Sequence, residues 1–173
     1  MSIIWYKYLR KFNIHIGYQI CLLYNKDKEV KFMHIVVCLE DCNGIMFNKR
    51  RVSSDKILIS KIIEMTQNKN LWVSEYSKEL FVDKELRNTR LMTVYDISDL
   101  VKIENNDYFF IEDILPDNLE RCSELIIFHW NRRYPSDVKF AYDLKDFTLV
   151  SSSDFKGFSH PEITEEYLKN INL

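Results

Sequence analysis

The chain has 173 residues and a net charge of −2, and apolar residues make up 46% of the sequence. This length and composition predict one globular domain, residues 1–173, with a core of its own. Three glycines and three prolines exclude a glycine-rich phosphate loop and a flexible Gly/Ser linker.

The cysteines and the apolar runs predict the cellular compartment. Cys38 and Cys42 are four residues apart, but no second pair and no nearby histidine completes a zinc site. Free thiols are typical of a reducing cytoplasm, where we expect this protein. No apolar run is long enough to span a membrane, and the N-terminal residues lack the pattern of a signal peptide. We therefore expect no cofactor, no metal and no membrane partner.

The start of the chain predicts a β-hairpin. Residues 14–24 and 30–39 are rich in apolar and β-branched residues, and the polar stretch 25–29 separates them. A helix is the alternative for 30–39, because short apolar runs are ambiguous.

The next segment predicts a turn and one clear helix. Asn43-Gly44 indicates a turn, after which residues 45–48 pair back. Residues 53–55, Ser-Ser-Asp, offer an N-cap for a helix over 55–67, where apolar residues recur at helical spacing. Residues 71–82 are ambiguous between helix and strand.

The middle of the chain predicts three strands. They cover residues 91–97, 108–114 and 124–130, with a turn at 105–107. Residues 116–122 predict a helical turn that Pro116 opens.

The C-terminal part predicts two more strands and a helix. Residues 138–144 and 147–151 are expected to pair with each other. Pro161 and Glu162 suit the first turn of a helix over 161–170. The predicted fold class is therefore α+β, a single domain with a mainly antiparallel sheet and two to four helices.

Residues 95–126 form an acidic block, which contains nine Asp and Glu residues and only two basic residues, Lys102 and Arg121. Such a block predicts a basic partner and argues against nucleic acid. Strand alternation predicts that one face of 108–114 is core and the other offers carboxylates beside apolar residues. An ordinary solvated face is the alternative. The predicted contact residues are Asp107, Tyr108, Glu112, Asp113, Asp117, Glu120 and Glu124.

The stretch FHWNRRYPSD, residues 128–137, has the residue types of a nuclease site. The candidate residues are His129, Arg132, Arg133 and Asp137. His129 would be a general base and one of the arginines would hold phosphate, with a second histidine among His15, His34 and His160. Alternation along a strand instead places Phe128 and Trp130 on one side and His129 on the other. A strand end that packs an aromatic residue into the core is the alternative explanation.

Two smaller motifs have simple structural explanations. Lys49-Arg50-Arg51 is a short basic run, and three charges are too few to predict a phosphate or lipid site. Ser159-His160-Pro161-Glu162 is typical of a helix N-cap.

The C-terminal part also resembles a protein family over residues 125–167. The motifs that carry the resemblance are WNRRYPSD at 130–137, Phe140, Asp143-Leu144, FKGFSH at 155–160 and Ile163-Thr164-Glu165. They are similar to immunity proteins of bacterial contact-dependent growth inhibition systems, of the type paired with ribonuclease toxins.

This resemblance implies a cytoplasmic protein that binds and neutralises the basic nuclease domain of a toxin and carries out no chemistry itself. The acidic block would cover the toxin's active site. The alternative function is a small RNA-cleaving nuclease that uses His129 with a second histidine, and a weaker alternative is a partner-binding module without a toxin.

Overall fold

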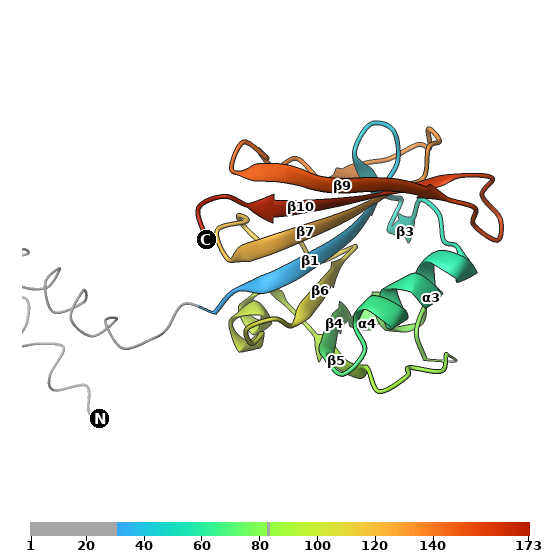
Figure 1. Ribbon diagram of the computed structural model, residues 1–173. Helices are drawn as coiled ribbons and strands as arrows, with labels where there is room; N and C mark the ends of the chain where they lie inside the picture. Colours follow the sequence, from blue (N-terminus) through green and yellow to red (C-terminus); the bar gives the residue numbers. More distant parts are fainter. Residues whose placement is uncertain (1–30, 83) are drawn as a thin grey trace, which may run out of the picture. The chain divides into compact units, whose positions relative to one another are not determined.

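The centre of the molecule is a mixed seven-stranded sheet with strand order β5-β4-β6-β1-β7-β10-β9 (Figure 1). The computed structural model describes residues 31–82 and 84–173. A second, smaller sheet has the order β3-β2-β8. The elements in chain order are β1 (Met33–Leu39), β2 (Gly44–Phe47), β3 (Arg50–Arg51), α3 (Lys56–Met65), β4 (Asn70–Ser74), α4 (Glu75–Lys78), β5 (Arg90–Val94), the 3-10 helix η2 (Ile97–Lys102), β6 (Tyr108–Ile111), β7 (Cys122–His129), β8 (Val138–Lys139), β9 (Phe147–Phe155) and β10 (Ile163–Asn170).

The predicted fold class is wrong in the direction of the strands. β5, β4, β6, β1 and β7 are parallel to one another, and β10 and β9 add the antiparallel pairs β7–β10 and β10–β9. The fold is therefore α/β with a mainly parallel sheet. The reason is visible in β1, whose seven residues are all buried, as expected for a parallel strand covered on both faces.

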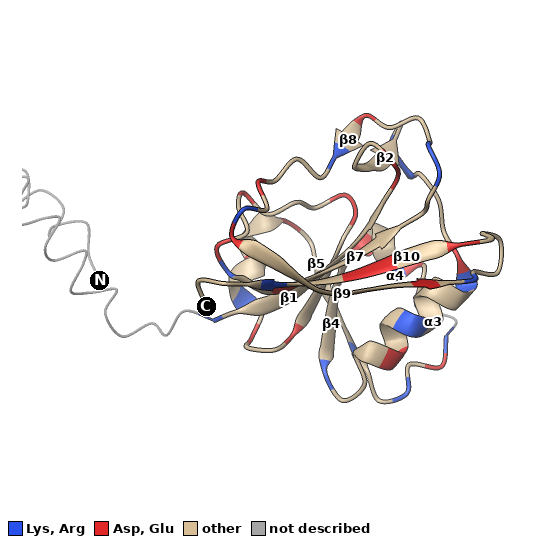
Figure 2. Cartoon of the chain, turned by 45° about the horizontal axis from the view of Figure 1, so that its top comes forward, with Lys and Arg blue, Asp and Glu red and all other residues tan. Residues whose placement is uncertain are grey.

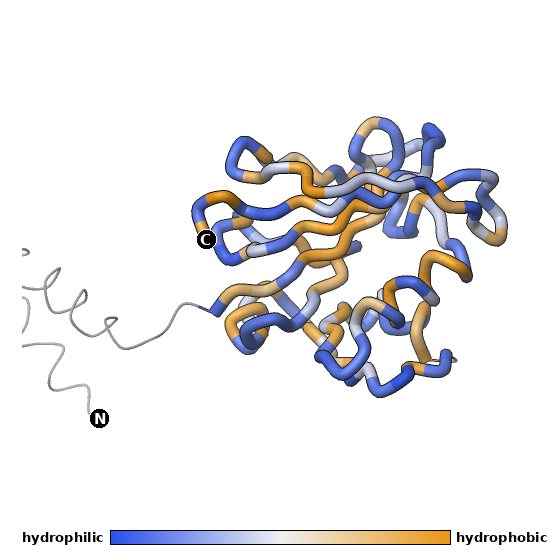
Figure 3. The backbone as a smooth tube through the Cα atoms, viewed as in Figure 1, coloured by the Kyte–Doolittle hydropathy of each residue, from blue (hydrophilic) through white to orange (hydrophobic). Residues whose placement is uncertain are grey.

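Two hydrophobic cores lie on opposite faces of this sheet. Ile35 and Val37 of β1 belong to one core, and Val36 and Cys38 belong to the other. Figure 3 shows the central strands as the most apolar part of the molecule and β9 as largely polar. Each buried aliphatic side chain stabilises the fold by about 1.5–3 kcal/mol relative to an exposed one.

Helix α3 packs on one face of the sheet, and its prediction is confirmed (Figure 1). The Asp55 carboxylate caps the helix by accepting from the backbone N–H groups of Ile57 and Leu58. Leu58 and Ile62 are buried, one turn apart, which is the spacing that predicted the helix.

The second strand of the predicted N-terminal hairpin is β1, so the strand prediction for this segment is confirmed and the alternative helix is wrong. In the described structure β1 bonds to β6 on one side and to β7 on the other. The other predicted strand, residues 14–24, lies outside the described residues.

The predicted C-terminal helix is also wrong, because residues 163–170 form β10. This strand lies between β7 and β9 and bonds to both. The strands predicted at 138–144 and 147–151 do not pair with each other, since β8 pairs with β2 and β9 pairs with β10. The helical turn predicted at 116–122 is absent, since residues 116–121 form no helix and Cys122 begins β7.

Over residues 31–82 and 84–173, no helix has the length and apolar character that crossing a membrane requires.

Candidate functional site

The carboxyl ends of the parallel strands are the first place to look for a site. In open α/β sheets, ligands bind outside these ends, where neighbouring strands are followed by different loops. Here β1 leads into Glu40, β6 into Glu112 and Asp113, and β7 into Trp130. Helix α3 begins beside them with Asp55.

Glu40 is a buried carboxylate that holds two loops together. It is 1% exposed and accepts from the backbone N–H groups of Gly44 (2.9 Å) and Tyr134 (3.3 Å) and from the Ser136 hydroxyl (3.1 Å). Burial alone would raise the pKa of Glu40, but backbone hydrogen bonds from Cys42, Gly44 and Tyr134 hold that pKa below its usual value. A side chain at position 44 would meet Ser136, which explains why glycine is needed there.

Glu112 is also buried, and it joins β6 to β3 and α4. Arg51 Nε lies 3.0 Å from one of its oxygens, and the Ser77 hydroxyl donates to the other at 2.7 Å. The Arg51 guanidinium also lies over the Tyr76 ring, 4.5 Å from its centroid. Burial raises the pKa of Glu112, and Arg51 and Ser77 oppose that shift. The hydrogen-bond donors to the Glu112 carboxylate therefore all come from side chains of the protein itself.

Asp55 and His160 form the third polar cluster. Besides capping α3, the Asp55 carboxylate accepts from the backbone N–H groups of Phe158 (2.9 Å) and Ser159 (2.8 Å), and it lies 3.2 Å from His160 Nδ1. Burial would raise the pKa of Asp55, but the hydrogen bonds from Phe158, Ser159, His160 and Ile57 hold it well below its usual value. These contacts attach the turn between β9 and β10 to the start of α3.

The other ring nitrogen of His160 meets two hydroxyls. Nε2 lies 3.0 Å from Ser53 Oγ and 3.2 Å from the Tyr134 hydroxyl. A hydroxyl, an imidazole and a carboxylate in this order can move a proton in hydrolases. Here His160 is 4% exposed and stacks on Trp130 at 4.7 Å, so the array primarily fixes the fold.

Four residues of the predicted contact surface are instead buried, as are Asp107 and Glu112, or half-buried with partners inside the fold, as are Tyr108 and Glu124. Asp107 is buried and accepts from Asn70 and from Trp72 Nε1 (2.8 Å). Glu124 pairs with His34 at 2.8 Å. Tyr108 stacks on the same imidazole, and Glu112 pairs with Arg51. The alternation predicted for 108–114 is absent, because β6 lies inside the sheet and Phe109, Phe110 and Ile111 are all buried.

The remaining predicted residues, Asp113, Asp117 and Glu120, are exposed. Asp117 and Glu120 line a groove of about 290 Å³ together with residues 141–143 and 145–147. Asp143 and Asp146 lie in the same groove, and neither was predicted. They are distant in sequence from the acidic block, and only the folded chain places them beside it. We call this feature the acidic groove.

The structure does not bring together the residues of the alternative nuclease site. His129 pairs with Glu166 at 3.0 Å. His34 lies at the other end of the sheet, because His129 is opposite Leu39, five residues along β1 or roughly 16 Å away. His160 stacks on Trp130, which points to the opposite face from His129. His15 lies outside the described residues.

The described residues offer no metal site, since residues 31–82 and 84–173 contain no group of three or more His, Cys, Asp or Glu that could hold an ion. Cys38 and Cys122 are buried free thiols. Burial raises the pKa of Cys38, and it raises the pKa of Cys122 to about 12, which disfavours the reactive thiolate.

Comparison with known proteins identifies the fold. No family model matches the chain, and no curated protein matches its sequence. Among solved structures, the chain is similar to a dihydrofolate reductase from Enterococcus faecalis in complex with NADP(H) and RAB-propyl. The TM-score is 0.56 and the identity is 8%, and the match covers 80% of this chain and 96% of that chain. At this identity the likeness concerns the fold alone.

This match contradicts the resemblance to contact-dependent growth inhibition immunity proteins, and with it the predicted immunity function. The motif residues have structural roles instead. Trp130 packs on His160, Tyr134 donates its backbone N–H to Glu40, and Phe140 is buried in a core. Such residues determine how strand ends and turns fit together, so their pattern is weak evidence for a partner.

The residues present do not fit a dinucleotide such as NADP(H). A pyrophosphate at the carboxyl ends of parallel strands is held by backbone N–H groups of a glycine-rich turn or of a helix N-terminus. In this chain β1 and β6 are followed by Glu40, Glu112 and Asp113, and the N-terminus of α3 is closed by Asp55. What the comparison shows is therefore a dihydrofolate reductase-like α/β fold.

Proposed function

We propose that the chain is a non-catalytic binding protein, and that the acidic groove takes a basic segment of a partner protein. The observation that carries this proposal is the concentration of charge in the groove. Four carboxylates line it against a single lysine. They are Asp117, Glu120, Asp143 and Asp146.

Most of this charge has no counterion within the described part of the chain. Lys145 pairs with Asp143 at 3.3 Å, and the other three carboxylates have no ion pair with residues 31–82 or 84–173. Like charges in one groove repel one another, and a cation that enters the groove removes part of that repulsion. Burial and the nearby Asp117 raise the pKa of Tyr142, another sign of local negative charge.

The floor and walls of the groove suit a long basic side chain. Leu119, Tyr142 and Phe147 contribute apolar surface between the carboxylates. Lysine and arginine bury their aliphatic stems against such surface and keep their charged ends in contact with carboxylates. Charge at the rim also accelerates association with a partner of opposite sign.

The proposal that the chain is not an enzyme is supported by the carboxyl ends of the strands. Glu40, Glu112 and Asp55 are each surrounded by internal donors. A catalytic acid or base must reach the substrate's reacting atoms, and these groups are already engaged inside the fold.

The test is the binding of a fluorescent nonapeptide of alternating Lys and Leu, followed by fluorescence anisotropy. The variant Asp117→Lys/Glu120→Lys should bind the peptide at least about tenfold more weakly, because it replaces two attractive charges in the groove by two repulsive ones. A tenfold change in affinity corresponds to about 1.4 kcal/mol. The difference should shrink as salt rises.

The matched control is Glu64→Lys/Glu79→Lys, which makes the same change in net charge at two exposed acids outside the groove. It should leave the affinity within about twofold of the original chain, as expected for independent sites. Equal weakening in both variants would mean that the peptide responds to net charge, and the groove would then have no specific role.

A further inference from the structure

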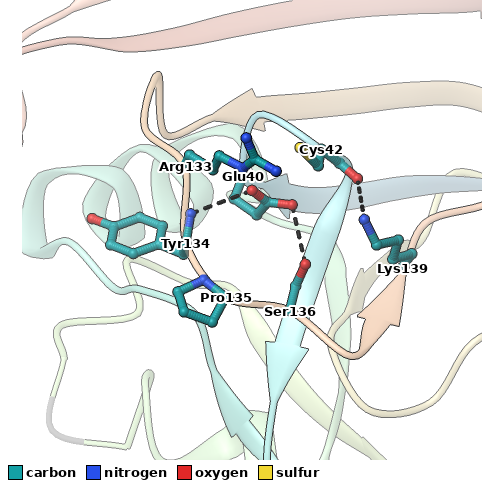
Figure 4. A pocket seen from close by; sticks show the side chains of 7 residues that line it. All are labelled: Glu40, Cys42, Arg133, Tyr134, Pro135, Ser136 and Lys139. Carbon is teal, nitrogen blue, oxygen red and sulfur yellow. Dashed lines mark hydrogen bonds between the residues drawn. The ribbon is translucent and has the colours of Figure 1, made fainter.

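A second surface, at the other end of the parallel strands, carries exposed positive charge. Two hollows lie there on either side of the ridge formed by Tyr134 and Pro135. The first, of about 440 Å³, is bordered by Arg133 and Lys139 (Figure 4). The second, of about 540 Å³, is bordered by Phe47 and Arg50. We call them the first and second cationic hollows.

The cations around these hollows are available to a ligand. Lys49, Arg50, Arg132 and Arg133 are exposed, and none of them has an ion pair within the described part of the chain. Lys139 donates only to the Cys42 carbonyl, at 3.1 Å. Figure 2 shows stretches of Lys and Arg, in blue, around β2 and β8.

The neighbouring acids cancel only part of this charge. Glu40 lines the first hollow but is surrounded by its own donors, and Figure 4 shows its carboxylate turned to Tyr134 and Ser136. Glu112 is paired with Arg51. The exposed acids nearby are Asp41, Asp113 and Asp137.

Aromatic surface accompanies the charge in the second hollow. Phe47 is 43% exposed at the end of β2, and its ring lines this hollow. The half-buried Tyr134 also lines this hollow, and Asn48 adds polar groups. An aromatic face can stack on a planar ring, and a guanidinium beside it can bind phosphate groups attached to that ring.

We propose that the cationic hollows bind a small molecule that carries phosphate groups and a planar ring. Arg50 and Arg133 hold phosphate oxygens from the two sides of the ridge, and Phe47 and Tyr134 contact the ring. The binding groups are side chains of the β2–β3 hairpin and of the loop between β7 and β8. This arrangement differs from the backbone cradle for a pyrophosphate, which the strand ends of this chain do not provide.

The site is separate from the acidic groove. The groove lies near Cys122, where β7 begins, whereas the hollows lie beyond His129, where β7 ends. The inference therefore does not depend on the proposed function, and each can fail without the other.

The test uses the full chain and three probes, ADP, pyrophosphate and adenosine, with binding measured by isothermal titration calorimetry. ADP should bind most tightly, pyrophosphate more weakly and adenosine weakest. Arg50→Ala and Arg133→Ala should each weaken ADP binding about tenfold, the usual effect of losing one charge-assisted contact.

Phe47→Leu separates the two parts of the site. Loss of the ring should remove most of the preference for ADP over pyrophosphate and leave pyrophosphate affinity within about twofold. The control for the arginines is Arg90→Ala, an exposed cation at the start of the edge strand β5, which should leave ADP binding unchanged.

Three results would overturn the inference. One is the absence of ADP and pyrophosphate binding at millimolar concentration. Another is equal ADP affinity in the original chain and in both hollow variants. The third is an affinity for oligoadenylate that rises with its length, because that would identify the surface as a nucleic-acid site.

Discussion

At the scale of single residues, two buried tryptophans differ in whether the indole N–H has a hydrogen-bond partner. Trp72 donates its Nε1–H to Asp107 at 2.8 Å. Trp130 is equally buried, but its Nε1 has no hydrogen-bond partner within the described residues. A buried donor without a partner destabilises the fold, whereas a satisfied one stabilises it.

The two tryptophans therefore predict different costs for the same substitution. Trp72→Phe should lower the free energy of unfolding by about 2 kcal/mol, because it removes a donor from the buried Asp107 carboxylate. Trp130→Phe should change it by less than about 1 kcal/mol, since the lost ring area is offset by removal of the unpaired N–H. Urea unfolding of both variants measures the difference, and equal costs would contradict this account.

Asp55 predicts a pH dependence of stability. Its hydrogen bonds hold its folded pKa well below the unfolded value of about 3.9. A carboxylate with a depressed pKa stabilises the fold above the unfolded pKa, and that contribution is lost as the pH falls below it. Asp55→Asn should therefore cost about 2–3 kcal/mol at pH 7, and this difference should shrink steadily as the pH falls below about 4.

The measurement for Asp55 is urea unfolding at several pH values between 7 and 3. The exposed Asp41 has no side-chain partner in the described part of the chain, so Asp41→Asn is the matched control and should show neither effect. A cost of Asp55→Asn that stays constant down to pH 3 would mean that packing, and not the charge, accounts for it.

At the scale of elements, the sequence predicts the features that depend on a few consecutive residues, such as helix caps and turns. It does not predict the relative directions of the strands. Helix α3 was predictable because its cap and its apolar spacing are contained within about a dozen residues. The turn at Asn43-Gly44 was predictable for the same reason, and Asn43 has a φ of 61°. Parallel pairing of β1 with β6 joins residues some seventy positions apart, and apolar content alone cannot reveal it.

The C-terminal strand shows how tertiary contacts override a local pattern. Pro161 and Glu162 are good residues for the start of a helix, and that pattern led to the wrong prediction. Residues 163–170 instead form a strand that is hydrogen-bonded to β7 along one edge and to β9 along the other. The neighbouring strands therefore satisfy the backbone N–H and C=O groups that a helix would satisfy with its own backbone.

The candidate site was predictable only in part, for a related reason. Charge counting identified Asp117 and Glu120, which lie in the acidic groove. It also identified Asp107 and Glu112, which are buried with their own donors. Composition gives the number of carboxylates but not which of them remain in contact with water.

At the scale of the whole molecule, opposite charges gather at opposite ends of the parallel strands. The acidic groove lies at the start of β7, and the cationic hollows lie at its end. β7 has eight residues, so the two ends are about 26 Å apart. This is several times the Debye length of about 8 Å at physiological salt, and direct attraction between the ends is therefore screened.

This separation predicts that charge changes at the two ends act independently on stability. Asp117→Lys/Glu120→Lys changes the net charge of −2 to +2, and Arg132→Glu/Arg133→Glu changes it to −6. The chain with all four substitutions returns to −2, which makes it the control for net charge. The changes in unfolding free energy of the two double variants should add up to that of the fourfold variant within about 0.5 kcal/mol, as expected for distant sites. Urea unfolding at physiological salt provides the measurement, and a coupling above about 1 kcal/mol would show that the ends interact through the fold.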